Sequence, residues 1–160
     1  MIHLYYGDGK GKTTAAAGLA LRAAGRDQRV IFAPFLKGRD SGEIEGFQLI
    51  SQVTVLRKDF AKKFTFEMNE TERREEARKS SDLLEEAFSQ AVSEKADLLI
   101  LDEVVSAAER RMISEERLRV LIEKHREQFE IVLTGRSPSD WMMEAADYAT
   151  RMEKVKHPYD

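Results

Sequence analysis

The chain has 160 residues, which suits one domain spanning 1–160, and a chain of this length buries roughly 70% of its unfolded surface, so it needs no covalent cross-link to fold. It contains no cysteine, which excludes disulfides, thiolate metal sites and cysteine nucleophiles and favours a reducing, cytoplasmic location. Its 26 basic and 29 acidic residues give a formal net charge of −3, and no apolar run reaches the roughly 18 residues of a membrane span, so we expect neither nucleic acid nor a membrane as partner.

Short apolar segments alternate with helical patterns along the chain. The strands that we expect, in chain order, are residues 2–6, 30–35, 52–56, 98–101, 131–133 and 148–152. The segments between them predict a glycine-rich turn at 7–11, a buried helix at 13–24, a polar loop at 37–46, an irregular stretch at 57–68, helices after Asn69 and Ser114, and a short helix ending at Ala146. Because strands that alternate with helices form parallel sheets, we predict an α/β fold with a mainly parallel sheet of five to six strands and helices on both faces.

Two of these helices carry recognisable start signals. Asn69 is followed three residues later by Glu72, which is the pattern of a capping box. Ser114 precedes a segment with an apolar helical face, and a serine hydroxyl at that position can accept a bond from a free backbone N–H. We therefore expect helices to begin directly after both residues.

The glycine-rich turn lies between the first strand and the first helix, and it leads into Lys-Thr. Its residues and their successors are Gly7, Asp8, Gly9, Lys10, Gly11, Lys12, Thr13 and Thr14. Glycines in such a turn let backbone N–H groups face phosphate oxygens, and the helix N-terminus adds a partial positive charge. We expect Lys12 to bind phosphate oxygens and the Thr13 hydroxyl to ligate Mg²⁺, as in a P-loop that holds a nucleoside triphosphate.

This loop departs from the usual P-loop spacing. Only three residues separate Gly7 from Gly11, one fewer than in the common motif, and Lys10 adds a second cation inside the loop. The alternative is an ordinary strand-to-helix turn with incidental lysines. The strand–loop–helix context favours the phosphate loop.

A pair of carboxylates follows the fourth expected strand. Asp102 and Glu103 come directly after an apolar segment, and ligands of open parallel sheets bind at the carboxyl ends of the strands. In a P-loop protein such an aspartate holds Mg²⁺, directly or through water. Glu103 is a second metal contact or a general base, and the sequence does not separate these roles. The alternative is a solvated transition from strand to loop.

Further segments match one family in order and spacing over nearly the whole chain. With the loop at 7–14, they are residues 18–20, 22–25, 35–38, 42–43, 64–67, 101–103, 133–136, 146–147 and 155–160. Together they resemble the P-loop type of ATP:corrinoid adenosyltransferase. The segment 104–108 departs from the family, because it lacks the bulky aromatic residue found there.

The resemblance implies a reaction, substrates and partners. The family transfers the 5′-deoxyadenosyl group of ATP to the cobalt of a reduced corrinoid, such as cob(I)alamin, and releases triphosphate. Cobalt(I) is then the nucleophile, which agrees with the lack of a recognisable Ser-His or Cys-His pair, while Mg²⁺ and the loop lysines stabilise the triphosphate leaving group. The resemblance also implies a homodimer and a flavin-type reductase as electron donor.

The resemblance assigns Phe64 and Phe66 to the corrinoid. If their stretch is extended, both rings face one side, because side chains alternate along a strand. Beneath the corrin ring they would displace the lower axial ligand and leave a four-coordinate cobalt that is easier to reduce. Phe66 stands where the family has tryptophan. The alternative is that both rings are core residues beneath a loop.

Arg136 follows the fifth expected strand and has three possible roles. It contacts the nucleotide, contacts the corrinoid, or caps its own loop, and the sequence does not choose among them.

Two other functions fit a phosphate loop. A small-molecule kinase would use the same loop and release ADP, although kinases of the thymidine-kinase type usually carry a cysteine zinc site that this chain lacks. A non-enzymatic, ATP-dependent switch would bind a protein partner in response to nucleotide and would not bind a corrinoid.

Overall fold

A six-stranded sheet forms the centre of the computed structural model, which describes residues 1–38 and 41–158. The strands are β1 (Ile2–Tyr6), β2 (Val30–Pro34), β3 (Val53–Val55), β4 (Leu98–Asp102), β5 (Glu130–Gly135) and β6 (Tyr148–Arg151). They lie in the order β3-β2-β4-β5-β1-β6, and all neighbouring strands are parallel. This arrangement confirms the predicted α/β fold. Tyr159 and Asp160, the end of the last matched segment, lie outside the described residues.

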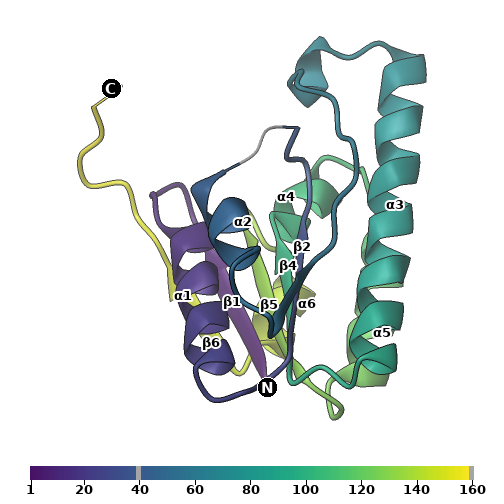
Figure 1. The fold of residues 1–160 in the computed structure, drawn as a ribbon. Helices are drawn as coiled ribbons and strands as arrows, with labels where there is room; N and C mark the ends of the chain where they lie inside the picture. The colour runs from purple at the N-terminus through teal and green to yellow at the C-terminus, as the bar shows by residue number, and fades with distance from the viewer. Residues whose placement is uncertain (39–40, 159–160) are drawn as a thin grey trace.

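Helices cover both faces of the sheet (Figure 1). They are α1 (Lys12–Ala24), α2 (Gly42–Phe47), α3 (Glu70–Ser93), α4 (Val104–Glu109), α5 (Glu115–His125) and α6 (Asp140–Ala145), with a 3₁₀ turn, η1 (Thr65–Glu67). Helices α1 and α2 pack on one face, and α3, α4, α5 and α6 pack on the other. No helix in the described part of the chain is both long and apolar enough to cross a membrane.

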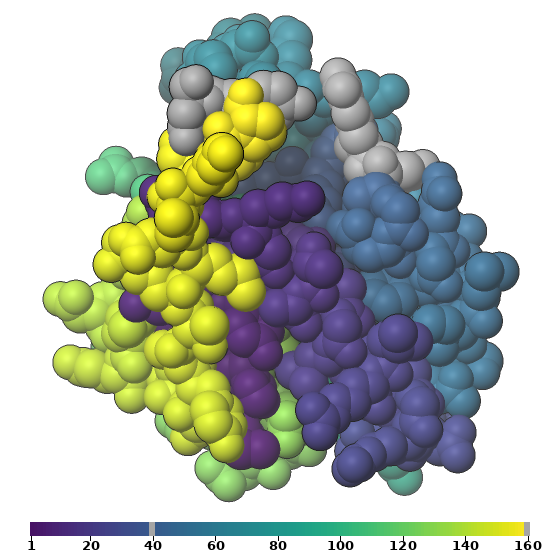
Figure 2. Space-filling view, turned by 90° about the vertical axis from the view of Figure 1, so that its left-hand side faces the viewer, coloured from purple at the N-terminus to yellow at the C-terminus, as the bar shows by residue number. Residues whose placement is uncertain are grey.

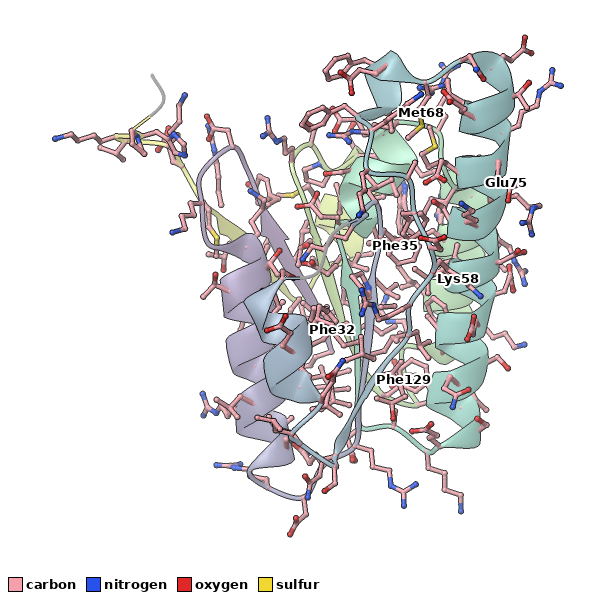
Figure 3. All side chains as sticks on the ribbon, turned by 45° about the horizontal axis from the view of Figure 1, so that its top comes forward. Phe32, Phe35, Lys58, Met68, Glu75 and Phe129 are labelled. Carbon is pink, nitrogen blue, oxygen red and sulfur yellow. The ribbon has the colours of Figure 1, made fainter. Side chains whose placement is uncertain are left out.

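Strand β2 shows how the sheet is buried on both sides. Phe32 packs in the cluster beneath α1 and α2, where its ring lies 5.0 Å from that of Phe47. Ile31 and Phe35 pack in the cluster beneath α3, on the opposite face (Figure 3). Every residue of β2 and β4 is buried, as parallel strands covered on both faces require. Polar side chains that act on a ligand must therefore lie at the strand ends.

Both predicted helix starts are present. The Asn69 side-chain oxygen accepts a hydrogen bond from Glu72 N at 2.9 Å, and a Glu72 carboxylate oxygen accepts one from Asn69 N at 3.0 Å. The Ser114 hydroxyl accepts a bond from Arg117 N at 3.1 Å. These bonds satisfy backbone donors that the first turns of α3 and α5 leave free.

The structure differs from the sequence expectations in two places. The loop predicted at 37–46 is wrong in its second half, because α2 begins at Gly42; its helical signal is an apolar pair, Ile44 and Phe47, that is buried against the sheet. Helix α4 was not expected either. It is only six residues long, too short to show a helical period, and it begins directly after Glu103, whose φ of 61° makes the sharp turn out of β4.

The end of β5 lies unusually close to α4. A Cβ atom on Gly135 would lie 2.6 Å from the backbone N of Ser106 and 2.6 Å from the Cβ of Val105. Real Cβ atoms do not approach other atoms so closely. A glycine at this position therefore allows β5 and α4 to meet where β4 and β5 end.

We expect Gly135→Ala to lower the free energy of unfolding by about 2 kcal/mol, because the added methyl group must push α4 away from β5. Gly18→Ala is the matched control: Gly18 is exposed within α1, and an added Cβ there meets nothing within 4 Å. The control should raise the free energy of unfolding by about 0.5–1 kcal/mol through helix propensity. Urea denaturation measures both, and a Gly135→Ala protein as stable as the unsubstituted chain contradicts the packing argument.

Candidate functional site

The glycine-rich loop, residues 7–11, lies against the segment that follows β6. The carbonyl of Met152 accepts a hydrogen bond from Gly9 N at 2.8 Å, and the N–H of Met152 donates to the carbonyl of Tyr6 at 2.7 Å. A Cβ on Gly9 would lie 2.7 Å from the backbone carbon of Met152, so this contact requires glycine. Figure 2 shows the C-terminal segment alongside the N-terminal residues. The pairing of β1 with β6 thus supports the loop from one side.

Lys12 and Thr13 open α1 at the end of this loop. Lys12 is buried, and its ammonium donates a hydrogen bond to the carbonyl of Gly9 at 2.8 Å. The charge therefore lies inside the loop, where oxygen atoms of a bound anion could replace the carbonyl. Gly11 precedes the helix with a φ of 114°, a left-handed conformation that favours glycine.

The side chains next to Lys12 and Thr13 in the glycine-rich segment face solvent, whereas its first two glycines do not. Asp8, Lys10 and Thr14 are exposed, whereas Gly7 and Gly9 are buried. An Asp8 carboxylate oxygen accepts a bond from Lys154 N at 3.3 Å, and this bond lowers the pKa of Asp8. The exposed side chains surround the opening of the loop.

The carboxylate of Asp102 is the point where the site elements converge. Asp102 ends β4 and is fully buried. Its Oδ1 accepts hydrogen bonds from the hydroxyls of Thr13, at 2.9 Å, and Thr134, at 2.8 Å. Its Oδ2 lies 2.7 Å from the ammonium of Lys37. These contacts join α1, β5 and the loop after β2, and they do not fit a solvated transition from strand to loop.

Lys37 bridges two carboxylates. Besides Asp102, its ammonium contacts a carboxylate oxygen of Glu43 at 3.0 Å, and the Ser41 hydroxyl donates to the same oxygen at 2.7 Å. Burial lowers the pKa of Lys37, but the charges and hydrogen bonds of Asp102 and Glu43 outweigh burial, so the pKa is raised above its usual value. Lys37 is therefore a cation at neutral pH.

Lys37, Glu43 and Thr134 belong to the site but to none of the motifs that predicted it. Each lies in a segment that matches the family, at 35–38, 42–43 and 133–136 respectively, so the position of the matches was the available signal. No local spacing pattern links these three residues to Asp102. The sheet order brings them together.

Glu103 differs sharply from its neighbour. Asp102 is fully buried, whereas Glu103 is half-buried and adopts a left-handed backbone conformation. Its N–H donates to the Thr134 hydroxyl at 2.8 Å, so the same hydroxyl that donates to Asp102 accepts from Glu103. Thr134 thereby holds both the carboxylate and the turn that follows it.

Arg136 directly follows β5, at the same carboxyl ends of the strands as Asp102. Its carbonyl accepts a hydrogen bond from Gly7 N at 3.0 Å, and its N–H donates to the Ser106 hydroxyl at 3.3 Å. The main chain of Arg136 therefore ties the loop after β5 to the glycine-rich loop. Its side chain is exposed beside that loop.

Phe64 and Phe66 are not core residues. Their exposed fractions are 65% and 81%, and their rings are stacked with centroids 5.4 Å apart and planes 6° from parallel. The stretch is a 3₁₀ turn and not extended, so strand alternation does not place the rings, yet the turn brings them together. A Glu67 carboxylate oxygen accepts from Phe64 N at 3.1 Å, and Arg73 donates to the Thr65 carbonyl at 3.0 Å. Figure 1 shows η1 at the same end of the molecule as the glycine-rich loop.

The oxygen atoms of Asp102 and Thr13, beside the glycine-rich loop, suit a hard cation that also binds phosphate oxygens. Among the described residues, no three His, Cys, Asp or Glu side chains gather into a metal site of their own. The Asp102 carboxylate and the Thr13 hydroxyl are oxygen donors in mutual contact, and Asp102 already holds a cation, the Lys37 ammonium. Mg²⁺ is commonly bound by one or two such oxygens together with phosphate oxygens, so these residues fit it.

Of two clefts in the described part of the chain, one adjoins the candidate site and the other lies away from it. One cleft of about 420 Å³ lies at the other end of the strands, where they begin, and is lined by Arg22, Arg26 and Arg126. None of the candidate residues lines it. A second, of about 360 Å³, adjoins the site and is lined by Lys37 and Lys58. The chemistry of the side chains, and not cleft volume, locates the candidate site.

We expect Thr134→Val to lower the free energy of unfolding by about 1–3 kcal/mol, because Glu103 N loses its acceptor and Asp102 Oδ1 keeps only the bond from Thr13. Thr134→Ser keeps the hydroxyl and should retain most of the stability. Chemical denaturation of both variants checks this. A loss of stability in the serine variant with none in the valine variant would show that the methyl group matters and the hydroxyl does not.

Comparison with known proteins identifies the family. The model of a family described as ATP:corrinoid adenosyltransferase BtuR/CobO/CobP matches residues 1–160. A corrinoid adenosyltransferase of Escherichia coli (strain K12) is 31% identical over 163 residues, covering 100% of this chain and 80% of the relative. One from Pseudomonas aeruginosa is 29% identical over 159 residues, covering 99% of this chain and 77% of the relative.

The fold also resembles a solved structure outside that set. A KaiC-like protein from Pyrococcus horikoshii superposes with a TM-score of 0.57 at 18% sequence identity, covering 98% of this chain and 74% of the other. At that identity the likeness shows a shared α/β fold alone. The match over residues 1–160, together with the similar corrinoid adenosyltransferases, shows that this chain belongs to the ATP:corrinoid adenosyltransferase family.

Proposed function

We propose that this protein transfers the 5′-deoxyadenosyl group of ATP to the cobalt of a reduced corrinoid, such as cob(I)alamin, and releases triphosphate. Family membership supports the reaction. The observation that supports the site is the fully buried Asp102 carboxylate, which accepts a bond from Thr13 at the start of α1. This places a carboxylate beside a glycine-rich loop that carries a buried lysine, as nucleotide binding requires.

The loop binds the triphosphate of ATP through several groups. Lys12 exchanges the Gly9 carbonyl for phosphate oxygens, and backbone N–H groups at the start of α1 donate to the same oxygens. The N–H of Gly9 already donates to Met152, so it holds the loop and is not available to phosphate. Lys10 is exposed at the loop and adds the second cation that a highly charged leaving group needs.

Asp102 and Thr13 hold Mg²⁺ in this proposal. When bound, the ion neutralises part of the negative charge on the triphosphate. The Thr13 hydroxyl donates a hydrogen bond to Asp102, and a lone pair on the same oxygen would remain for the ion. Glu103 is half-buried one residue further on, and we assign it to the water molecules around the ion.

The transfer itself moves a carbon group and no proton. An electron pair of cobalt(I) attacks C5′ of ATP, the cobalt–carbon bond forms, and the C5′–oxygen bond breaks with its pair leaving on triphosphate. Because no proton moves, the step requires no general base, which agrees with the role assigned to Glu103. The protein aligns the two substrates and stabilises the charge of the leaving group through Lys12 and Lys10.

The exposed, stacked rings of Phe64 and Phe66 form an apolar surface that suits the lower face of a corrin ring. There they exclude water and the lower axial ligand, which eases reduction of cobalt(II). Arg136, exposed beside the glycine-rich loop, is assigned to the nucleotide. We further propose a flavin-type reductase as electron donor, a homodimer, and a cytoplasmic location.

The proposed function is tested by incubating the protein with ATP, Mg²⁺ and chemically reduced cobalamin. The expected result is the spectrum of a carbon–cobalt product that light destroys. Absence of this product, with ATP binding demonstrated in the same preparation, contradicts the proposal.

Lys12→Ala should abolish most ATP binding, because it removes a buried cation and its charge-assisted hydrogen bonds to phosphate. Lys10→Ala should weaken binding less, since Lys10 is exposed. Lys124→Ala is the matched control, an exposed lysine on α5. Calorimetry with ATP measures all three, and unchanged affinity in Lys12→Ala removes the basis for the phosphate loop.

Asp102→Asn should slow turnover about tenfold or more, because it keeps the shape of the side chain and removes a metal-binding charge. Glu103→Gln should have a smaller effect. Asp97→Asn is the control, because Asp97 is exposed just before β4, at the opposite end of the strands from the site. Turnover that is equal in all three variants, or that persists in EDTA, rules out the metal assignment.

Phe64→Ala and Phe66→Ala should fold with unchanged thermal stability, since both rings are exposed. They should bind ATP, fail when cobalt(II) must be reduced by a mild flavin reductant, and recover partly with preformed cobalt(I). Leu49→Ala, at a side chain 88% exposed, is the control. Electron paramagnetic resonance of cob(II)alamin with ATP should show four-coordinate cobalt in the unsubstituted protein only. An unchanged spectrum in both phenylalanine variants contradicts the assignment.

A further inference from the structure

Lys37 occupies one oxygen of Asp102, the carboxylate that we propose as a metal ligand. Its ammonium lies 2.7 Å from Oδ2, while Oδ1 accepts from Thr13 and Thr134. Both oxygens of this fully buried carboxylate are therefore engaged. A divalent cation that binds Asp102 has to displace the ammonium of Lys37.

The backbone holds Lys37 in this place. Pro34 is the register partner of Asp102 in the sheet, and the N–H of Phe35 donates to the carbonyl of Asp102 at 2.9 Å. Leu36 then adopts a φ of 59°, a left-handed conformation that is rare for a bulky residue and persists only where packing enforces it. Leu36 packs against the core beneath α3, and the turn that it makes directs Lys37 toward Asp102.

The charges around Asp102 explain why the ammonium and a metal ion exclude one another. A buried carboxylate without a cation is strongly destabilising, so Lys37 stabilises the site as the structure shows it. A divalent ion beside the ammonium would place two cations on one buried carboxylate. The triphosphate of ATP supplies the negative charge that makes this exchange favourable.

Glu43 offers the displaced ammonium a second acceptor. One of its carboxylate oxygens lies 3.0 Å from Nζ of Lys37 and is held by the Ser41 hydroxyl. Lys37 can therefore leave Asp102 without losing every partner.

We infer that Lys37 is a positioning residue that occupies the metal's place on Asp102 until MgATP arrives, so that the protein takes up divalent metal with its nucleotide and not ahead of it. This inference rests on the proposed function. It assigns Lys37 a competing role, because the affinity for free metal is reduced by the fraction of molecules in which the ammonium holds Asp102.

The test measures binding of Mn²⁺ without nucleotide, by the electron paramagnetic resonance of the free ion. Lys37→Met keeps the length of the side chain and removes its charge, and it should bind Mn²⁺ about tenfold more tightly than the unsubstituted protein. Lys58→Met is the matched control: Lys58 lines the same cleft but points toward α3 (Figure 3), where it contacts Glu86 at 2.5 Å. The control should leave Mn²⁺ affinity unchanged. A purely structural role for Lys37 predicts weaker metal binding in its variant.

A second arm uses Glu43→Gln, which remains informative if Lys37→Met does not fold. Removing the negative charge of the second acceptor should hold Lys37 more firmly on Asp102 and weaken binding of MnATP about threefold. In a foldable Lys37→Met background the same change should have no effect, since the competing ammonium is absent. Undiminished MnATP binding in Glu43→Gln overturns the inference, as does an equal effect of Glu43→Gln in both backgrounds.

The unsubstituted protein separates this inference from the proposed function. If it fails to bind MnATP, the nucleotide site itself is wrong and the inference falls with it. If it binds MnATP, and Lys37→Met folds but gains no affinity for Mn²⁺ alone, the nucleotide site stands and only the role of Lys37 is overturned.

Discussion

One buried negative charge organises this end of the molecule. The carboxylate of Asp102 is fully enclosed, and an enclosed charge must be matched by cations and hydrogen-bond donors from the protein itself. Those groups come from α1, β5 and the loop after β2, as Thr13, Thr134 and Lys37. The sheet order places β4 between β2 and β5, which is why three segments distant in sequence can reach one carboxylate.

The two surfaces that we propose for the substrates differ in character. The nucleotide side is enclosed and braced: the glycine-rich loop is held by Met152 and by the main chain of Arg136. The side proposed for the corrinoid carries two exposed rings, Phe64 and Phe66, on a single 3₁₀ turn that Arg73 ties to α3. Fixed placement of the triphosphate beside this apolar surface would suit the proposed reaction, to which the protein contributes positioning and charge stabilisation.

Sequence patterns predicted what depends on local chemistry. Buried strands, the capping residues Asn69 and Ser114, and the loop before α1 all follow from nearby residues. Helices α2 and α4 were not predicted because a segment of six residues is too short to show a helical period. In addition, α2 contains two glycines, and α4 follows β4 almost directly. Lys37 and Thr134 were not predicted as site residues because only the sheet order brings them to Asp102. The exposure of Phe64 and Phe66 could not be read from composition, which favours burial of phenylalanine.

The central claim is that the phosphate loop stabilises an intact triphosphate as it leaves C5′. Phosphorus nuclear magnetic resonance of the products, with ATP, Mg²⁺ and cob(I)alamin supplied, tests it most directly. We expect inorganic triphosphate in equal amount to the carbon–cobalt product, with no ADP formed in step with it. ADP as the stoichiometric product, which a kinase or an ATP-dependent switch would give, would contradict the account.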